Sequence, residues 1–288
     1  MTLSFDQWHN SGQVFNWQGH DVFYQTMGQG PALLMIHGFP TSSYDYAEMA
    51  ETLKQHFTLI IPDMLDYGQS HNPMKKRCSI FDQVDMMTDL LAHLGHQQLH
   101  ILAHDVGDTI AQEMLHRENQ GELGFEIASC VLQNGGLVVD HHRPRRIQKL
   151  LLGPFGPIIA QLTRKAKFSR SLTAIMGQDT QLSAQQLDDI WRSTLGINGK
   201  ASLARRIHYM TERIVNRDRW VKALQDTKHH VLMINGTDDP ISGGHACDAF
   251  ETLFPKMTII RMAGIGHFPP IEAPSRTVEY FLKHHQLI

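Results

Sequence analysis

The chain has 288 residues, of which 42% are hydrophobic and 19% are charged, a composition typical of a globular protein with a sizeable core. Its formal net charge of −3 provides no broad basic surface, so we expect no nucleic-acid partner. No apolar run reaches the roughly 18 residues of a transmembrane helix, and the first residues lack the pattern of a signal peptide. Three widely spaced cysteines without a CxxC pair are typical of free thiols in a reducing compartment, so we expect a cytoplasmic protein.

The first half of the chain alternates short apolar strands with helices. Strands are predicted at 14–17, 22–27, 32–36, 57–61, 99–103 and 128–133, and helices at 43–54, 80–94 and 106–117. The strands from 32–36 onward are apolar throughout rather than alternating with polar residues. This pattern indicates a mostly parallel sheet that helices cover on both faces.

The alternation stops at about residue 137 and resumes near residue 226. Between these points the apolar residues recur only at helical spacing, and the strands 231–235 and 257–262 then complete a sheet of eight. Helices are predicted near 245–253 and from about 274. We therefore predict an α/β fold with a core formed by 1–136 and 226–288, and a helical cap (137–225) inserted after the sixth strand. Such a cap would lie over the carboxyl ends of the strands, where open α/β sheets bind ligands.

The segment AHDVG (103–107) lies where a strand passes abruptly into a helix. The small residues Ala103 and Gly107 fit a strained turn in which strand and helix come close together and the central side chain is exposed. That central residue is Asp105, and the chain contains no GxSxG motif. A carboxylate here can displace a leaving group at a saturated carbon and form an alkyl ester. The alternative is that Asp105 only caps the helix, a common use of aspartate.

An acid and a base follow in the order expected for a catalytic triad. Asp239, in the turn after strand 231–235, is expected to orient His267, which follows the last strand and would activate water. Asp238 is the less favoured acid, and either aspartate could be only a turn residue. The amides of Phe39 and Val106 are predicted to form an oxyanion hole, and the bond before Pro40 is a candidate cis peptide.

These motifs together resemble the epoxide hydrolase and haloalkane dehalogenase branch of the α/β-hydrolase superfamily. HGFP (37–40), the aspartate turn, GTDDP (236–240) and GIGHF (264–268) stand at the matching places over nearly the whole chain. Within that branch the chain looks similar to the mesoderm-specific transcript proteins, a family described as epoxide-hydrolase-like. That similarity lies in HGFPTSSYDY (37–46), HLGHQQLHILAHDVGDTIAQEMLHR (93–117), LQNGGL (132–137) and HRPRRIQKLL (142–151).

The resemblance implies hydrolysis through an Asp105 ester, and the leaving group separates two reactions. Dehalogenases of this branch use side-chain N–H donors at the positions of Val106 and Phe39, and neither side chain here can donate. Epoxide hydrolases use two cap tyrosines, of which this cap has one, Tyr209, whose alternative role is packing with its hydroxyl in solvent. We predict an epoxide hydrolase that releases a vicinal diol, with a dehalogenase-like hydrolase or a non-catalytic binding protein as alternatives.

The remaining predictions concern the pocket and partners. Either His208, Trp191 or Trp220 would replace the missing tyrosine, or one donor would suffice, and these three residues are expected to line the substrate pocket with His37, Pro40 and His104. We expect a small lipophilic substrate, no cofactor and no metal site. Residues 141–178 contain eight lysines and arginines but no acid. This segment is either a solvated face or a surface that contacts an anionic membrane or guides substrate.

Overall fold

The computed structural model describes residues 3–72 and 77–287, and within them eight strands form one sheet. The strand order across the sheet is β1-β2-β4-β3-β5-β6-β7-β8. The strands are β1 (Gln13–Trp17), β2 (His20–Met27), β3 (Ala32–Ile36), β4 (Thr58–Pro62), β5 (Gln98–Ala103), β6 (Glu126–Leu132), β7 (Val231–Gly236) and β8 (Thr258–Met262). The eight predicted strands are therefore present, each within a few residues of its expected limits.

The sheet is parallel except at one edge. β1 pairs with β2 and β2 with β4 in antiparallel register, whereas every pair from β4 to β8 is parallel. All five residues of β3 are buried, because this central strand is covered on both faces. The carboxyl ends of the parallel strands consequently meet at one edge, and the loops that follow them are brought together.

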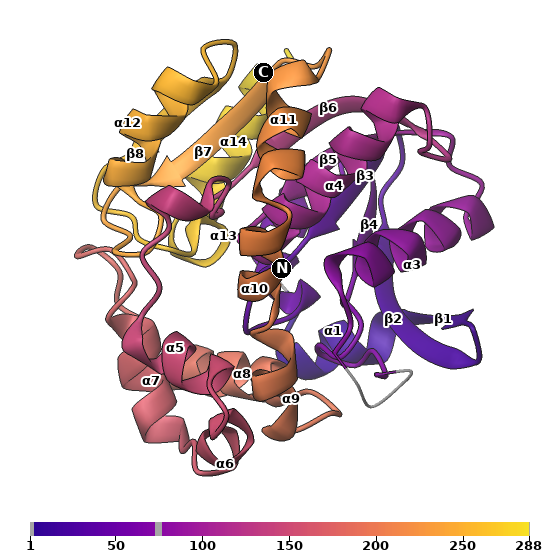
Figure 1. The fold of residues 1–288 in the computed structure, drawn as a ribbon. Helices are drawn as coiled ribbons and strands as arrows, with labels where there is room; N and C mark the ends of the chain where they lie inside the picture. Colours follow the sequence, from indigo (N-terminus) through magenta and orange to yellow (C-terminus); the bar gives the residue numbers. More distant parts are fainter. Residues whose placement is uncertain (1–2, 73–76, 288) are drawn as a thin grey trace.

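Two layers of helices enclose the sheet (Figure 1). One apolar cluster joins it to α3 (Ile80–His93), α4 (Val106–Gln120), α11 (Arg217–Asp226) and α12 (Gly244–Leu253). The second cluster, on the opposite face, joins it to α1 (Phe5–Ser11), α2 (Ala47–Leu53) and α14 (Pro274–His284). Alternate residues of β3 serve the two clusters, with Leu34 in the first and Leu33 in the second.

In the described residues between β6 and β7, the regular elements are all helices and none is a strand. They are the 3₁₀ turn η2 (Val139–His141) and α5 (Arg146–Leu152), α6 (Gly156–Gln161), α7 (Lys165–Thr173), α8 (Ala184–Leu195), α9 (Ala201–Arg206), α10 (Tyr209–Val215) and α11. Figure 1 shows α5 to α9 gathered below the sheet, and α11 alongside α4. Trp220 and Ala223 of α11 accept hydrogen bonds from α4 through their carbonyls. The part of the chain that lies over the strand ends is thus shorter than the predicted cap (137–225), because the last helix of that segment, α11, covers the sheet instead.

Three local features differ from the sequence-based expectation. The helix predicted at 43–54 begins as a 3₁₀ turn, η1 (Ser43–Tyr46), before α2 starts. The first helix, α1, is too short to show helical periodicity, and a capping box between Ser4 and Gln7 starts it. A second short helix that the sequence did not predict, α13 (Pro269–Glu272), opens with two prolines, which helices tolerate in their first turn.

Candidate active site

Asp105 occupies a strained turn between β5 and α4. Its φ of 49° and ψ of −103° lie outside the ordinary regions for an L-residue, and such a conformation persists only where the surroundings fix it. The Asp105 amide donates to the Gln133 carbonyl at 3.0 Å, and a Cβ on Gly107 would lie 2.3 Å from the Ile36 carbonyl oxygen. The turn therefore requires glycine at 107, as the sequence predicts for a strained turn in which strand and helix come close together.

The Asp105 side chain does not cap the helix that follows it. Although Asp105 stands at the N-cap position, its carboxylate makes no capping hydrogen bond to the described residues of α4. Oδ2 instead accepts the Phe39 amide at 3.1 Å, and Oδ1 lies 3.4 Å from Nη2 of Arg213. The geometry therefore contradicts the simple capping role and leaves the carboxylate available at the strand ends.

His267 faces Asp105 with one ring nitrogen and Asp239 with the other. Nδ1 donates to Asp239 Oδ2 at 2.8 Å, and Nε2 lies 4.0 Å from Asp105 Oδ2. All three side chains are buried. The arrangement matches a triad in which the acid fixes the tautomer of the base and the base points at the nucleophile.

Asp239, rather than its neighbour Asp238, occupies the acid position. Its carboxylate accepts hydrogen bonds from Asn134 Nδ2 at 3.0 Å and from the amides of Ile241 and Ser242 at 2.7 and 3.1 Å. The Asp238 side chain is exposed, and its Oδ1 accepts long hydrogen bonds from the Gly264 amide at 3.3 Å and the Thr237 hydroxyl at 3.4 Å. A buried carboxylate needs several donors to remain ionised, and only Asp239 has them here.

The charges of the site support one another. Burial alone would raise the pKa of Asp105, but the positive charges of Arg213 and His267 outweigh it and hold that pKa below its ordinary value. Burial alone would lower the pKa of His267, yet the charge and hydrogen bond of Asp239 raise it to about 9. For Asp239, the effect of burial is exceeded by His267 and the hydrogen bonds, which lower its pKa to about 2. The resting site therefore holds an imidazolium between two carboxylates.

The loop after β3 supplies the Phe39 amide. Its Phe39–Pro40 peptide bond is cis, and a Cβ on Gly38 would lie 2.8 Å from the Cβ of Asp105. His37 braces the loop from behind: Nε2 accepts the Met64 amide at 3.1 Å, so Nδ1 carries the hydrogen and donates to the Gly38 carbonyl at 3.0 Å. His37 thus lies beneath the loop, whereas Pro40 lines the cavity described below.

The other predicted pocket residues do not all reach the site. His104 does, and its Nε2 is 2.7 Å from the His267 carbonyl oxygen, on the loop that holds the base. Trp220 packs on α4 and donates to Glu113 at 3.0 Å, so its N–H is occupied away from Asp105. Trp191 stacks on Phe168, and neither it nor His208 lines the cavity next to His267. The structure therefore contradicts Trp191, His208 and Trp220 as pocket residues.

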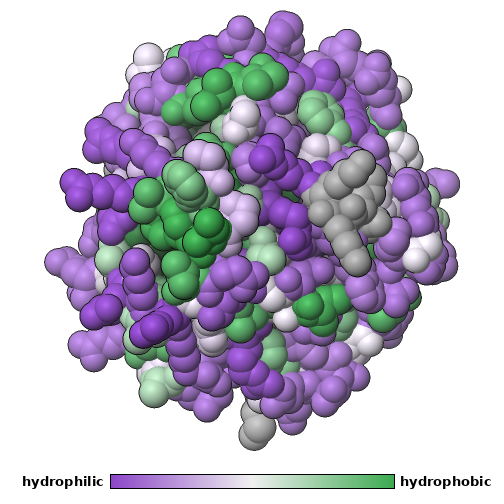
Figure 2. Space-filling view, turned by 60° about the horizontal axis from the view of Figure 1, so that its bottom comes forward, coloured by the Kyte–Doolittle hydropathy of each residue, from purple (hydrophilic) through white to green (hydrophobic). Residues whose placement is uncertain are grey.

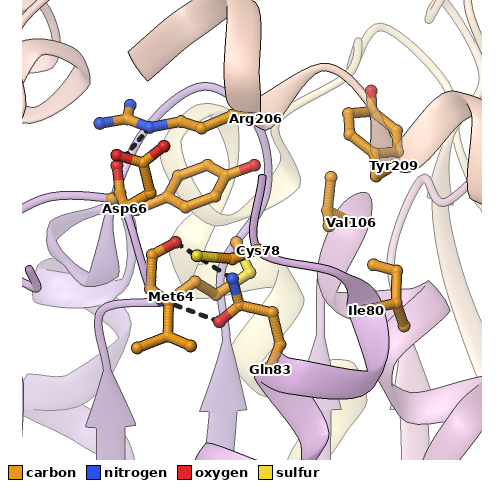
Figure 3. Close-up of a pocket in the computed structure, with 10 residues that line it drawn as sticks. Met64, Asp66, Cys78, Ile80, Gln83, Val106, Arg206 and Tyr209 are labelled. Carbon is orange, nitrogen blue, oxygen red and sulfur yellow. Dashed lines mark hydrogen bonds between the residues drawn. The ribbon is translucent and has the colours of Figure 1, made fainter. Parts of the chain in front are cut away.

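Tyr209 lies beside the nucleophile turn. It lines a small cavity with Val106, and Figure 3 shows its hydroxyl turned away from Ile80. The ring is buried, which excludes the packing role with a solvated hydroxyl, and burial raises its pKa. Within the described residues the hydroxyl makes no hydrogen bond of normal geometry, although the Gln148 amide is near enough to act on it. A buried unpaired phenol has a proton to offer a ligand.

A cavity of about 280 Å³ extends from the base to the cap. Phe39, Pro40, Ile241 and His267 line its inner end, and its remaining walls come from α5, α6, α7 and α9. Most of these cap residues are apolar, among them Ile147, Leu151, Ile159, Leu172, Ile175 and Leu203. The cavity is large enough for a small molecule and its lining favours a lipophilic one.

Arg213, on α10, is a site residue that the sequence analysis did not identify. Nη2 donates to the Asp105 carbonyl at 2.7 Å, and Nε donates to Thr109 Oγ1 at 2.7 Å. The guanidinium lies 4.7 Å from the centre of the Tyr209 ring, and its Nη1 has no partner among the described residues. No local motif marks this arginine, because it reaches Asp105 only through the folding of the cap.

Two further polar residues, Asn134 and Glu272, form hydrogen bonds that hold Asp239 and the loop of His267 in place. Asn134, after β6, has a φ of 45° and donates to both the Gly236 carbonyl and Asp239. Glu272, in α13, accepts hydrogen bonds from two amides of the loop that carries His267, those of Gly266 at 3.0 Å and Phe268 at 2.8 Å. The same Glu272 carboxylate accepts from the cap, through the Gly177 amide and the Thr180 hydroxyl, both at 2.7 Å.

The fold and the site together define a class of protein. Residues 31–274 match the model of the alpha/beta hydrolase fold family, and the chain belongs to that family. It is 36% identical over 286 residues to the mesoderm-specific transcript homolog protein of Bos taurus, an alignment that covers 95% of this chain and 85% of the relative.

Two further similarities involve epoxide hydrolases. A soluble epoxide hydrolase from Corynebacterium sp. is 35% identical over 96 residues, 32% of each protein. The solved structure of the epoxide hydrolase CorEH superposes with a TM-score of 0.77 at 19% identity, over 94% of this chain and 97% of that one. At this identity the structural likeness concerns the fold alone.

Proposed function

We propose that the chain is a hydrolase that opens epoxides through an ester on Asp105. One observation carries the proposal: a buried carboxylate, free of the helix that follows it, faces an imidazole that a second carboxylate orients. Membership of the α/β-hydrolase fold family supports hydrolysis in general. A carboxylate nucleophile favours attack at a saturated carbon, and this narrows the proposed class of hydrolysis.

The first step needs Asp105 ionised and a proton donor at the leaving oxygen. Oδ1 attacks an epoxide carbon, the carbon–oxygen bond breaks, and Tyr209 gives its proton to the alkoxide, to be reprotonated by the proton that His267 then releases. The Arg213 guanidinium, whose Nη2 lies 3.4 Å from Asp105 Oδ1 and whose Nη1 has no partner among the described residues, would stabilise the same developing charge. We propose that the tyrosine and the arginine together replace the missing second cap tyrosine.

The second step needs a base and uses the change of charge on Asp105. Esterification removes the negative charge that helps to hold the proton on His267, so the pKa of His267 falls from its resting value of about 9. Neutral His267 then takes a proton from water, which attacks the Asp105 carboxyl carbon. The Phe39 amide already donates to Asp105 Oδ2 and would stabilise the oxyanion that forms there. Collapse of this intermediate breaks the bond between the Asp105 carboxyl carbon and the substrate oxygen, which takes the proton that His267 received from water. The hydroxyl proton left on Asp105 then passes to His267, so that the diol leaves and the carboxylate is restored.

Trapping the ester tests this proposal. His267→Gln should retain the first step and lack the second, so incubation with lipophilic epoxides should add one substrate mass to the protein, at Asp105. The double variant Asp105→Asn/His267→Gln is the matched control and should remain unmodified. Adducts from haloalkanes alone would assign the chain to dehalogenation instead, and the absence of any adduct from a broad panel would favour a binding protein.

An isotope experiment separates this route from direct attack of water on the substrate. After a single turnover in ¹⁸O-labelled water, the label should appear in the Asp105 carboxylate and the diol should carry the original aspartate oxygen. Label in the diol but not in Asp105 would exclude the ester.

A further inference from the structure

The cap carries an exposed apolar patch at α5 and α6. Its members are Leu150, Phe155, Ile158 and Leu162, which are 54%, 68%, 59% and 71% exposed. The last three recur at helical spacing along α6 and therefore share one face of it. Figure 2, which brings the bottom of Figure 1 forward, shows an apolar patch of this kind surrounded by hydrophilic side chains. Large exposed apolar side chains gathered in one place are typical of an interaction surface.

The patch surrounds the outer end of the cavity that leads to His267. Leu150 and Leu162 both line that cavity while being more than half exposed, so it reaches the surface between them. Phe155 and Ile158 extend the apolar surface outward and do not line the cavity. A lipophilic molecule could therefore pass from the patch to the base along walls that are mostly apolar.

Unpaired positive charge accompanies the patch. Arg145 and Lys167 line the same cavity as Leu150 and Leu162. Of the eight cations between residues 141 and 178, Lys165 forms an ion pair with Asp188, and the other seven have none within the described part of the chain. These seven are Arg143, Arg145, Arg146, Lys149, Arg164, Lys167 and Arg170. An apolar patch with cationic side chains beside it, in a segment of chain without acidic residues, matches the interface of an anionic bilayer.

We propose that the α5–α6 patch docks on an anionic membrane surface, with Phe155 and Ile158 entering the lipid and the cavity opening toward it. No helix in the described residues is long and apolar enough to span a bilayer, so the contact proposed is peripheral. The second part of the proposal, that the substrate is a lipophilic epoxide drawn from the bilayer, rests on the proposed function. The docking itself does not.

Vesicle binding tests the docking. The full chain should float with vesicles of phosphatidylcholine containing phosphatidylglycerol and not with phosphatidylcholine alone, and binding should weaken with salt. Phe155→Asp/Ile158→Asp should reduce the bound fraction at least about tenfold, from lost apolar burial and added repulsion. The control Val14→Asp/Val215→Asp removes two similarly exposed apolar side chains from β1 and α10 and should bind like the original chain.

Several results would overturn the proposal. They are the absence of binding to either vesicle, an equal loss in the control variant, or a dimer in light scattering that Phe155→Asp/Ile158→Asp converts to a monomer. The last result would assign the patch to a second copy of the chain.

Ester trapping in the His267→Gln background separates the two proposals. A long-chain epoxide presented in anionic vesicles should give an adduct that Phe155→Asp/Ile158→Asp reduces, whereas a short water-soluble epoxide should be unaffected. Vesicle binding without any adduct would contradict the proposed function alone. An adduct from the soluble epoxide without vesicle binding would contradict the docking alone.

Discussion

The core side and the cap side of the site are held in different ways. On the core side, loops after parallel strands fix Asp105, Asp239 and His267 through hydrogen bonds to buried backbone and side-chain groups. On the cap side, the Tyr209 hydroxyl and Nη1 of Arg213 are buried without hydrogen-bond partners among the described residues. The comparison teaches that hydrogen bonds fix the side chains of the core before any ligand binds, whereas the cap keeps donors that a ligand could satisfy.

The largest loss of activity is expected when Asp239, the acid on the core side, is replaced. Asp239→Asn should lower kcat by about 10⁴-fold, because an amide can neither hold the correct His267 tautomer nor stabilise its positive charge. The adjacent Asp238→Asn is the matched control, and it should retain nearly full activity because its side chain is exposed. Steady-state rates on the epoxide identified by trapping measure both, and equal losses would show that the acid is misassigned.

Removing the charged group of the cap comes next. Arg213→Gln should lower kcat/KM by about 10²- to 10³-fold through loss of an electrostatic donor. Without this guanidinium, burial raises the pKa of Asp105, so the acidic limb of the pH–rate profile should move to higher pH. Arg217→Gln removes an exposed, ion-paired arginine of the next helix and should change neither. A lower rate with an unmoved acidic limb would leave Arg213 a purely structural residue.

The uncharged cap donor should have a smaller effect. Tyr209→Phe should slow ester formation about 10²-fold, the lower end for a proton donor, because Arg213 remains to stabilise the alkoxide. Single-turnover mass spectrometry of the adduct measures this step. Tyr280→Phe, on the opposite side of the sheet, serves as the control. Unchanged adduct formation with Tyr209→Phe would remove the phenol from the mechanism.

The smallest expected effect is a change of rate-limiting step with pH. Ester formation requires ionised Asp105, whose pKa is lowered, and protonated Tyr209, whose pKa is raised, whereas ester hydrolysis requires neutral His267, whose pKa is raised by Asp239. Lowering the pH from about 8.5 to 5.5 should therefore slow hydrolysis more than formation, and the esterified fraction at steady state should grow. Acid quenching followed by intact mass measures that fraction. A fraction that grows with rising pH would contradict the assigned order of steps.

Sequence reasoning predicted the candidate site residues that local patterns mark, and the structure brings these residues together. Asp105, Asp239 and His267 each follow an apolar strand, and parallel strands necessarily bring such loops to one edge. It did not identify Arg213, which contacts a residue 108 positions away through the packing of α10. It placed Trp220 in the pocket because an indole N–H is a plausible donor, whereas Glu113 on α4 accepts that hydrogen bond instead. Helical periodicity defines which face of a helix is buried but not which neighbour buries it.

Glu272 joins the base to the cap. Its carboxylate binds both the backbone around His267 and the segment that contains Gly177 and Thr180. A hinge motion that lifted this segment would strip hydrogen bonds from the loop of the base and displace the imidazole. We therefore expect ligands to enter and leave past Leu150 and Leu162, where the cavity lining is apolar, so that exchange does not disturb the loop that holds His267.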